Sequence, residues 1–311
     1  MIPGQDRRWT LMGLRYRRDD CGSAHRCGGF ALFLLIAAVL PWVAPSDARC
    51  QGAGDLVVAP TRIVFEGRTR TAQLSLLNKG SAAATYRISL INMRMTENGG
   101  FKEIDEPDPG EQFADRLIRY APRQVVLAPG DTQSVRLLLR KPRGLEPGEY
   151  RSHLLLRAIP SQNIGMSVEE PSKDDTGIRI RLIPIYGVTI PVIVRHGDLT
   201  AKVSLTDLAL VPAGGQGEGD RLSFRINRDG DRSVFGDLTV TYVPNGAKAD
   251  ELVVAQVTRL AVYTPNASRT VMMALRFPDG VTLGRGRLHV AFREISKNGG
   301  ALLGEAAIGV P

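Results

Sequence analysis

Cysteine and histidine are scarce in this 311-residue chain, which has three cysteines and four histidines. Cys21 and Cys27 lie in an N-terminal leader that we expect to be removed, so Cys50 alone would remain and no intrachain disulfide would form. Neither residue type recurs at a metal-ligand spacing, and a Gly-x-Ser-x-Gly elbow is missing. We therefore predict no metal, no cofactor and no enzymatic activity.

Dense basic runs and a phosphate-binding glycine loop before a helix are also missing, although the sequence pI is about 9.7. The arginines alternate with apolar residues, which argues against nucleic-acid binding and leaves a basic surface that would attract acidic partners. Ser152 and His153 are adjacent, so on a strand they point to opposite faces and do not form a nucleophile–base pair. We expect His153 near the surface of a sheet.

Long hydrophobic runs are limited to one, from residue 30 to 40, behind a leader that carries six arginines. A small-residue exit follows at 45–48, and this pattern predicts a secretory signal peptide over residues 1–48. The run is shorter than the roughly 20 residues that span a bilayer, which makes a membrane anchor the weaker alternative. We expect an exported protein with no stable membrane insertion after signal cleavage.

Helical periodicity is nearly absent after residue 55, where short alternating runs are separated by turn residues. The expected strands are 56–59, 62–65, 71–77, 85–95, 118–120, 123–127, 132–139, 150–159, 202–210, 221–227, 236–242, 255–262, 270–275 and 286–293. Pro60 suits an edge strand that kinks or changes sheet. The pattern predicts an all-β chain with a Greek-key sandwich over 53–196, a hinge at 196–198 and a second all-β domain over 198–311.

The stretch from residue 177 to 195 is the most apolar of these runs. Its even positions are apolar throughout, whereas its odd positions begin with arginines, so one face of an extended strand would be apolar along its whole length. It is about three times as long as an ordinary strand, or it forms two strands that join near Gly187. Either it fills the core of its own domain, or it offers apolar surface to a partner.

Several motifs of the first domain occur together, in an order and spacing that carry a resemblance. They are Ala-Pro-Thr-Arg-Ile-Val-Phe at 59–65, Leu-Asn-Lys-Gly at 77–80, Tyr-Ala-Pro-Arg-Gln at 120–124, Leu-Ala-Pro-Gly at 127–130, Gly-Glu-Tyr-Arg-Ser at 148–152 and Ile-Pro-Val-Ile-Val-Arg at 190–195. Over residues 55–196 the sequence resembles the periplasmic chaperones of the chaperone–usher pilus pathway. Beyond residue 198 the resemblance rests on position and all-β character alone.

This resemblance implies two immunoglobulin-like β-sandwich domains in tandem, set at an angle, in a protein of the periplasm. It implies pilus or fimbrial subunits and an outer-membrane usher as partners. The last strand of the first domain would complete the subunit's unfinished sandwich by strand addition. The side chains that fill the subunit's groove would be Ile178, Ile180, Leu182 and Tyr186.

The resemblance also implies that a cleft arginine and a cleft lysine hold the subunit's C-terminal carboxylate. Arg62 matches the arginine, whereas Pro191 stands where the lysine is expected. Arg181, Arg195 and Arg157 are the substitutes that the sequence offers, without a choice among them. Arg62 has the alternative reading of a solvated strand residue or a member of an intrachain ion pair.

Two other classes of function stay open. An exported structural or adhesive β-sandwich protein of the cell surface would polymerise by itself, whereas a chaperone would be a monomer or weak dimer that forms one-to-one complexes. A secreted sandwich enzyme or carbohydrate-binding module would need a cluster of site residues that the sequence does not offer.

Overall fold

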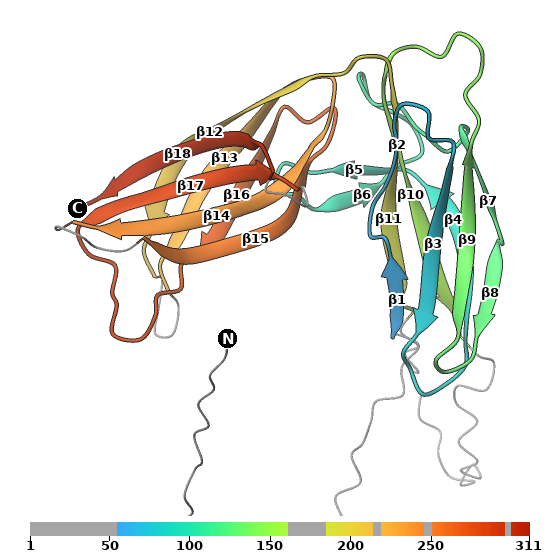
Figure 1. Ribbon diagram of the computed structural model, residues 1–311, viewed down its shortest axis with the longest axis horizontal. Helices are drawn as coiled ribbons and strands as arrows, with labels where there is room; N and C mark the ends of the chain where they lie inside the picture. The colour runs from blue at the N-terminus through green and yellow to red at the C-terminus, as the bar shows by residue number, and fades with distance from the viewer. Residues whose placement is uncertain (1–54, 161–184, 214–218, 246–250, 296–299) are drawn as a thin grey trace, which may run out of the picture. The chain divides into compact units, whose positions relative to one another are not determined.

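The computed structural model describes residues 55–160, 185–213, 219–245, 251–295 and 300–311 (Figure 1). The predicted signal peptide and the predicted groove-filling residues Ile178, Ile180 and Leu182 lie outside these ranges. In the described part of the chain, no helix has the length and apolar character needed to cross a membrane. The described elements are strands, and the prediction of an all-β chain is confirmed.

The first sandwich consists of two sheets whose strands are mostly antiparallel. The four-stranded sheet has the order β1 (Leu56–Ala59), β3 (Thr71–Asn78), β9 (Thr132–Leu139), β7 (Ile118–Ala121). The five-stranded sheet has the order β2 (Ile63–Phe65), β11 (Gly187–His196), β10 (Gly148–Ile159), β4 (Ala84–Ile91), β8 (Gln124–Leu127). Apart from the edge strands that change sheet, this is the strand order of an immunoglobulin-like sandwich.

The chain changes from one sheet to the other at two prolines. β1 pairs with β3 in one sheet, and β2, which follows Pro60, pairs in parallel with β11 in the other. β7 and β8 divide in the same way around Pro122. Proline donates no backbone hydrogen bond, so it suits the point where a strand leaves one ladder and joins another. Of the two alternatives expected at Pro60, a kink or a change of sheet, the structure has the change of sheet.

The second sandwich has a three-stranded and a four-stranded sheet. The first has the order β12 (Ala201–Val211), β13 (Arg221–Gly230), β16 (Ser268–Ala274). The second has the order β15 (Leu252–Val262), β14 (Val234–Pro244), β17 (Gly286–Glu294), β18 (Leu302–Val310). β18 was not among the expected strands because its alternation includes glycine and alanine positions with little hydrophobic contrast.

Each sandwich has its own core, built from the inward positions of alternating strands. Phe65, Leu154 and Val192 are fully buried in the first core, as are Phe224 and Phe292 in the second. Residues Gln51–Pro311 nevertheless form one compact unit. The predicted domain boundary at 196–198 therefore stays a prediction.

A short hairpin corrects the expectation of one continuous strand over 85–95. The chain leaves the five-stranded sheet at Asn92, whose side-chain oxygen accepts a 2.6 Å hydrogen bond from the Ser152 hydroxyl. β5 (Met93–Met95) then pairs with β6 (Phe101–Glu103) in a separate two-stranded sheet. Met95 is buried in the core of the second sandwich. The hairpin thus ties the two sandwiches together.

Candidate functional site

Arg62 lies immediately before β2, and its guanidinium reaches the second sandwich. It donates a 3.2 Å hydrogen bond to the Tyr263 hydroxyl and a 3.4 Å hydrogen bond to the Ser233 hydroxyl. Its central carbon lies 4.4 Å from the centroid of the Phe235 ring. Burial lowers the pKa of Arg62 below its usual value. The side chain is half-buried and stacked on an aromatic ring, so it is not a solvated strand arginine.

A hollow of about 310 Å³ lies around this guanidinium. Its lining consists of Thr61, Arg62, Phe101, His153, Thr189, Pro191, Phe235, Arg259 and Tyr263. Two of these side chains are guanidinium groups, and the lining includes no carboxylate. A site with two guanidinium groups and aromatic walls favours an anionic group, above all a planar carboxylate.

Aromatic rings pack against one another and against arginine in the wall of the hollow. The Tyr263 ring lies 4.5 Å from the guanidinium carbon of Arg151, and its centroid lies 6.0 Å from that of Phe101. Arg151 is buried and donates a 3.2 Å hydrogen bond to the Thr264 carbonyl. Phe101 comes from β6, so the hairpin contributes directly to the wall. The geometry of the hollow therefore depends on both sandwiches and on the hairpin.

His153 lies on β10 as expected, but the prediction that it is near the surface is wrong. Its side chain is only 2% exposed, because the Phe101 ring packs edge-on against it with centroids 5.4 Å apart. Burial, together with the nearby positive charge of Arg151, lowers the pKa of His153 to about 3. The imidazole is therefore neutral at physiological pH and adds no charge to the hollow.

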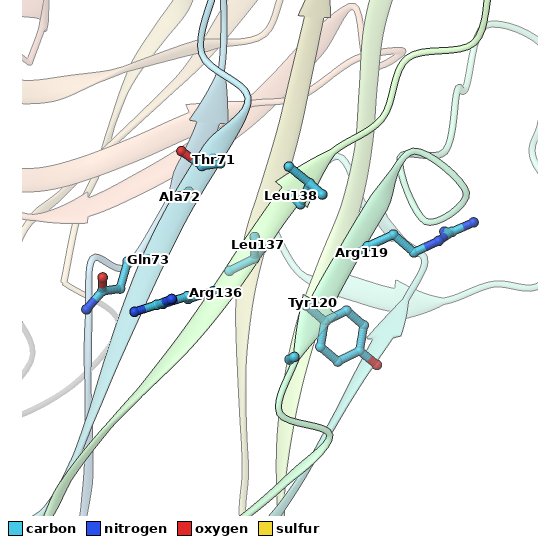
Figure 2. Close-up of a pocket in the computed structure, with 9 residues that line it drawn as sticks. Thr71, Ala72, Gln73, Arg119, Tyr120, Arg136, Leu137 and Leu138 are labelled. Atoms are coloured by element: carbon cyan, nitrogen blue, oxygen red, sulfur yellow. The ribbon is translucent and has the colours of Figure 1, made fainter.

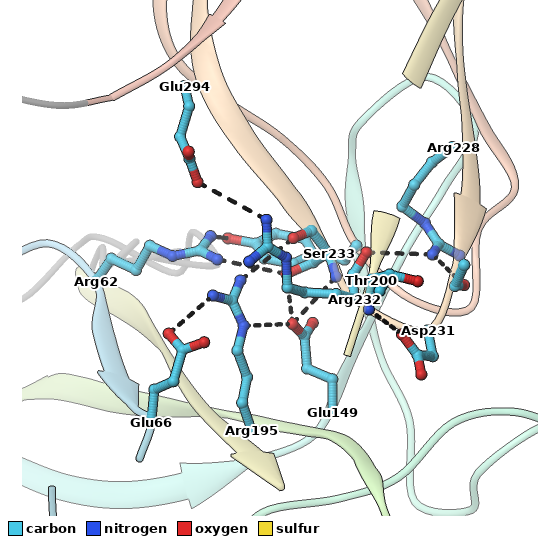
Figure 3. A network of polar contacts seen from close by, with 12 residues as sticks. Arg62, Glu66, Glu149, Arg195, Thr200, Arg228, Asp231, Arg232, Ser233 and Glu294 are labelled. Atoms are coloured by element: carbon cyan, nitrogen blue, oxygen red, sulfur yellow. Dashed lines mark hydrogen bonds and ion pairs between the residues drawn. The ribbon is translucent and has the colours of Figure 1, made fainter. Parts of the chain in front are cut away.

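Arg195 belongs to a buried polar network beside the hollow (Figure 3). Arg195 forms ion pairs of 3.1 Å with Glu149 and 3.2 Å with Glu66. The same Glu149 oxygen accepts hydrogen bonds from the backbone and hydroxyl of Ser233, at 3.1 and 2.9 Å. Arg195 thus has its own carboxylate partners, which argues against its use as the second cation.

The other two substitutes for the missing lysine are no better placed. Arg157 is exposed and lies opposite Gly187, four positions along β11 from Pro191, and it is not part of the lining of the hollow. Arg181 lies outside the described residues. The structure instead brings Arg259, from β15, into the lining that holds Arg62 and Pro191. Arg259 was missed because 197 positions of sequence separate it from Arg62, and no local pattern joins them.

The first half of β11 has an open backbone edge. β11 pairs with β10 from Gly187 to His196, but β2 covers its other side only from Val192 to Val194. In the described part of the chain, no strand pairs with that side of residues 187–191. An open edge of this kind is a template for another strand.

Apolar side chains continue past the core along this open edge. Ile190, Val192 and Val194 belong to the first core, so the even positions of β11 face inward. Tyr186 and Val188 continue the same alternation, yet they are 51% and 37% exposed. Val188 was missing from the predicted groove-filling set, although its even position is the signal that places it there.

A larger hollow, of about 740 Å³, lies on the four-stranded sheet of the first sandwich (Figure 2). Arg119, Arg136 and Leu138 line it, from β7 and β9. Figure 2 shows the labelled side chains spread over neighbouring strands, without convergence on one point. Among the described residues, no group of three or more His, Cys, Asp or Glu side chains is placed to hold a metal ion. The smaller hollow at Arg62 has the more specific chemistry.

Comparison with known proteins gives matches to solved structures only. The YadV chaperone matches with a TM-score of 0.40 and 12% identity, over 82% of this chain and 100% of that one. The SafB chaperone of Salmonella enterica, in complex with the SafA pilin, gives a match with a TM-score of 0.39 and 13% identity, over 83% and 97%. The Pseudomonas aeruginosa CupB2 chaperone gives 0.36 and 11%, over 81% and 98%.

All three of these matches are chaperone structures. No protein-family model and no curated protein matches the sequence. TM-scores and identities this low leave the activity of the present chain to be inferred from its own residues.

Proposed function

We propose that this protein is a periplasmic chaperone that binds incomplete β-sandwich subunits of pili or fimbriae, adds a strand to them and delivers them for assembly. The observation that carries the proposal is the open edge of β11, where Tyr186 and Val188 extend the inward face of the first sandwich into solvent. An incoming sandwich that lacks one strand would pair its backbone with this edge. Its groove would receive the side chains that project past the core.

Burial of apolar side chains in the groove of a subunit would favour the complex over the free protein. Each large apolar side chain that passes from water into a groove contributes about 1.5–3 kcal/mol, before the cost of association. Tyr186, Val188 and the groove-filling residues predicted before them, Ile178, Ile180 and Leu182, would together supply a substantial part of the binding energy. The subunit in turn would have its own exposed edge covered, which protects it from aggregation.

Arg62 is the proposed anchor for the subunit's C-terminal carboxylate. It is held by the Tyr263 hydroxyl and by the Phe235 ring, so its position is fixed before a ligand arrives. No ion pair that the described residues form includes its guanidinium. A fixed guanidinium contributes register as well as affinity. An outer-membrane usher would receive the complex, as the resemblance implies.

Co-purification with a pilus subunit in the periplasm tests the proposal. The wild-type protein is expected to yield a soluble one-to-one complex, and Leu182→Asp or Tyr186→Asp is expected to lose it, because a charge would enter the apolar groove. Val126→Asp is the matched control, since Val126 is 66% exposed on β8, at the opposite edge of the same sheet.

Two results would count against strand addition at β11. One is a Tyr186→Asp complex as abundant as that of the wild type. The other is loss of the complex with Val126→Asp alone, which would move the contact to β8. Polymerisation of the protein by itself, without a subunit, would favour the alternative of a structural or adhesive cell-surface protein.

A further inference from the structure

The strand β15 has an irregularity that directs one side chain into the hollow. Gly236 pairs with Leu260 and Leu238 pairs with Val257, so Thr258 and Arg259 together lie opposite Asp237. This is a β-bulge, a feature that re-aims side chains and is frequent beside functional sites. Arg259 has a φ of 60°, in the left-handed region that residues other than glycine rarely adopt.

The bulge is held by a specific contact. The backbone N–H of Arg259 donates a 2.8 Å hydrogen bond to a carboxylate oxygen of Asp237. This bond holds the strained residue in place from the opposite strand. Strained backbone persists where the surrounding structure fixes it, and such positions cluster at binding sites.

The guanidinium of Arg259 is thereby brought to the other sandwich. It donates a 3.3 Å hydrogen bond to the hydroxyl of Thr61, the residue directly before Arg62. Arg259 is exposed and lines the same hollow of about 310 Å³ as Arg62 and Pro191. The positive charge that Pro191 cannot supply thus comes from Arg259 on β15, a strand of the second sandwich.

The two arginines leave the hollow with unbalanced positive charge. Glu149 and Glu66 are bound to Arg195, and Asp237 accepts from the backbone of Arg259. The ion pairs that form among the described residues include neither Arg62 nor Arg259. Two preorganised guanidinium groups without an acidic partner match the two oxygens of one carboxylate.

We propose that Arg259 is the second cation of the carboxylate anchor and acts together with Arg62 on the C-terminal carboxylate of the bound subunit. This inference rests on the proposed function. It makes the anchor a joint product of the two sandwiches, because Arg62 comes from the first and Arg259 from the second. Asp237 is then a positioning residue that fixes the bulge.

The test uses synthetic peptides of a subunit's C-terminal strand, one with a free carboxylate and one with a carboxamide. Their affinities are measured by fluorescence anisotropy, and the ratio between the two peptides reports the anchor. The wild-type protein is expected to prefer the free acid by about tenfold or more, as charge-assisted hydrogen bonds usually give. Arg259→Ala and Arg62→Ala are each expected to reduce this ratio, and the double variant is expected to bring it close to one.

Arg259→Gly separates binding from folding. Glycine adopts a φ of 60° without strain, so this variant is expected to keep or raise the melting temperature while the ratio falls. Arg259→Lys should retain part of the preference, and Asp237→Ala should weaken it. Arg136→Ala is the matched control, since it removes an exposed strand arginine on the other sheet of the first sandwich.

Three outcomes contradict the proposal. They differ in whether they also contradict the carboxylate anchor and the proposed function. A ratio that Arg62→Ala lowers but Arg259→Gly leaves unchanged overturns the role of Arg259 and keeps the proposed function. A ratio of one in the wild type overturns the carboxylate anchor as a whole, while sensitivity of both peptides to Tyr186→Asp would still support strand addition. Failure of both peptides to bind the wild type removes the proposed function together with this inference.

Discussion

The buried His153 predicts an acid-sensitive contribution to stability. Its pKa is lowered to about 3, because its side chain is 2% exposed and lies near the positive charge of Arg151. An unfolded histidine has a pKa of about 6.5. Between these two values the unfolded chain binds a proton that the folded chain does not. The stability due to the neutral, buried imidazole is therefore complete above about pH 6.5 and decreases as the pH falls toward 3.

The magnitude follows from the width of this window. One unit of pKa difference corresponds to about 1.4 kcal/mol, so a fall from neutral pH to about pH 4.5 should remove about 2–3 kcal/mol of unfolding free energy through His153 alone. Carboxylates of the protein add their own pH dependence. The contribution of His153 is isolated by comparison with His153→Gln, which does not titrate.

Urea unfolding followed by circular dichroism measures this difference, since both tryptophans, Trp9 and Trp42, lie in the predicted signal peptide. The wild type is expected to lose about 2–3 kcal/mol more than His153→Gln between pH 7 and about pH 4.5. His289→Gln, which removes a half-exposed histidine of the second sandwich, is the matched control. Equal pH dependence of the wild type and His153→Gln would refute the reasoning.

Two further stability measurements examine the junction of the two sandwiches. Glu149→Leu should cost about 3 kcal/mol, because among the described residues it leaves the half-buried Arg195 with Glu66 as its one acidic partner. Arg195→Met in the same chain should recover most of the loss. A double variant as unstable as the single one would contradict the ion-pair argument. Met95→Ala should cost about 2–5 kcal/mol, because Met95 is buried in the second core; a loss below about 1 kcal/mol would mean that the hairpin is not anchored there.

Local signals in the sequence were sufficient for most strands of the fold. Period-two alternation located most of the strands that form both cores, and the Ala-Pro-Gly motif at residues 128–130 lies in a turn in which Gly130 has a φ of 80°. Pro60 indicated a kink or a change of sheet, because proline cannot continue a ladder on both sides. These features depend on a residue and its immediate neighbours, so they can be predicted from the sequence.

Apart from β18, whose alternation has little hydrophobic contrast, the features that the sequence did not predict depend on distant contacts. The break at Asn92 is stabilised by Ser152, sixty positions away, and the burial of His153 depends on Phe101 of the hairpin. The resemblance implied a role for Arg62, but its stacking on Phe235 depends on a residue of the second sandwich that no local pattern joins to it. The position of the Arg259 side chain depends on a bulge and on a left-handed backbone conformation, and a strand-like pattern indicates neither.

Pro191 connects the open edge of β11 with the hollow at Arg62. The pairing of β2 with β11 begins at Val192, so Pro191 lies where the open part of the edge meets the covered part. Proline interrupts a ladder, and an added strand that pairs with residues 187–190 would therefore end at this point. The hollow with Arg62 and Arg259 lies at the same place.

This arrangement fixes the direction of the proposed partner. A strand whose C-terminal carboxylate lies in the hollow must run from Gly187 toward Pro191, which is the direction of β11 itself, so the added strand would be parallel. β2 already pairs with β11 in parallel just beyond this point. An antiparallel partner would place its N-terminal end against two guanidinium groups, and the like charges of an amino terminus would disfavour it. In the proposed complex, the charge of the hollow would thus select strand direction, whereas the apolar edge would contribute affinity.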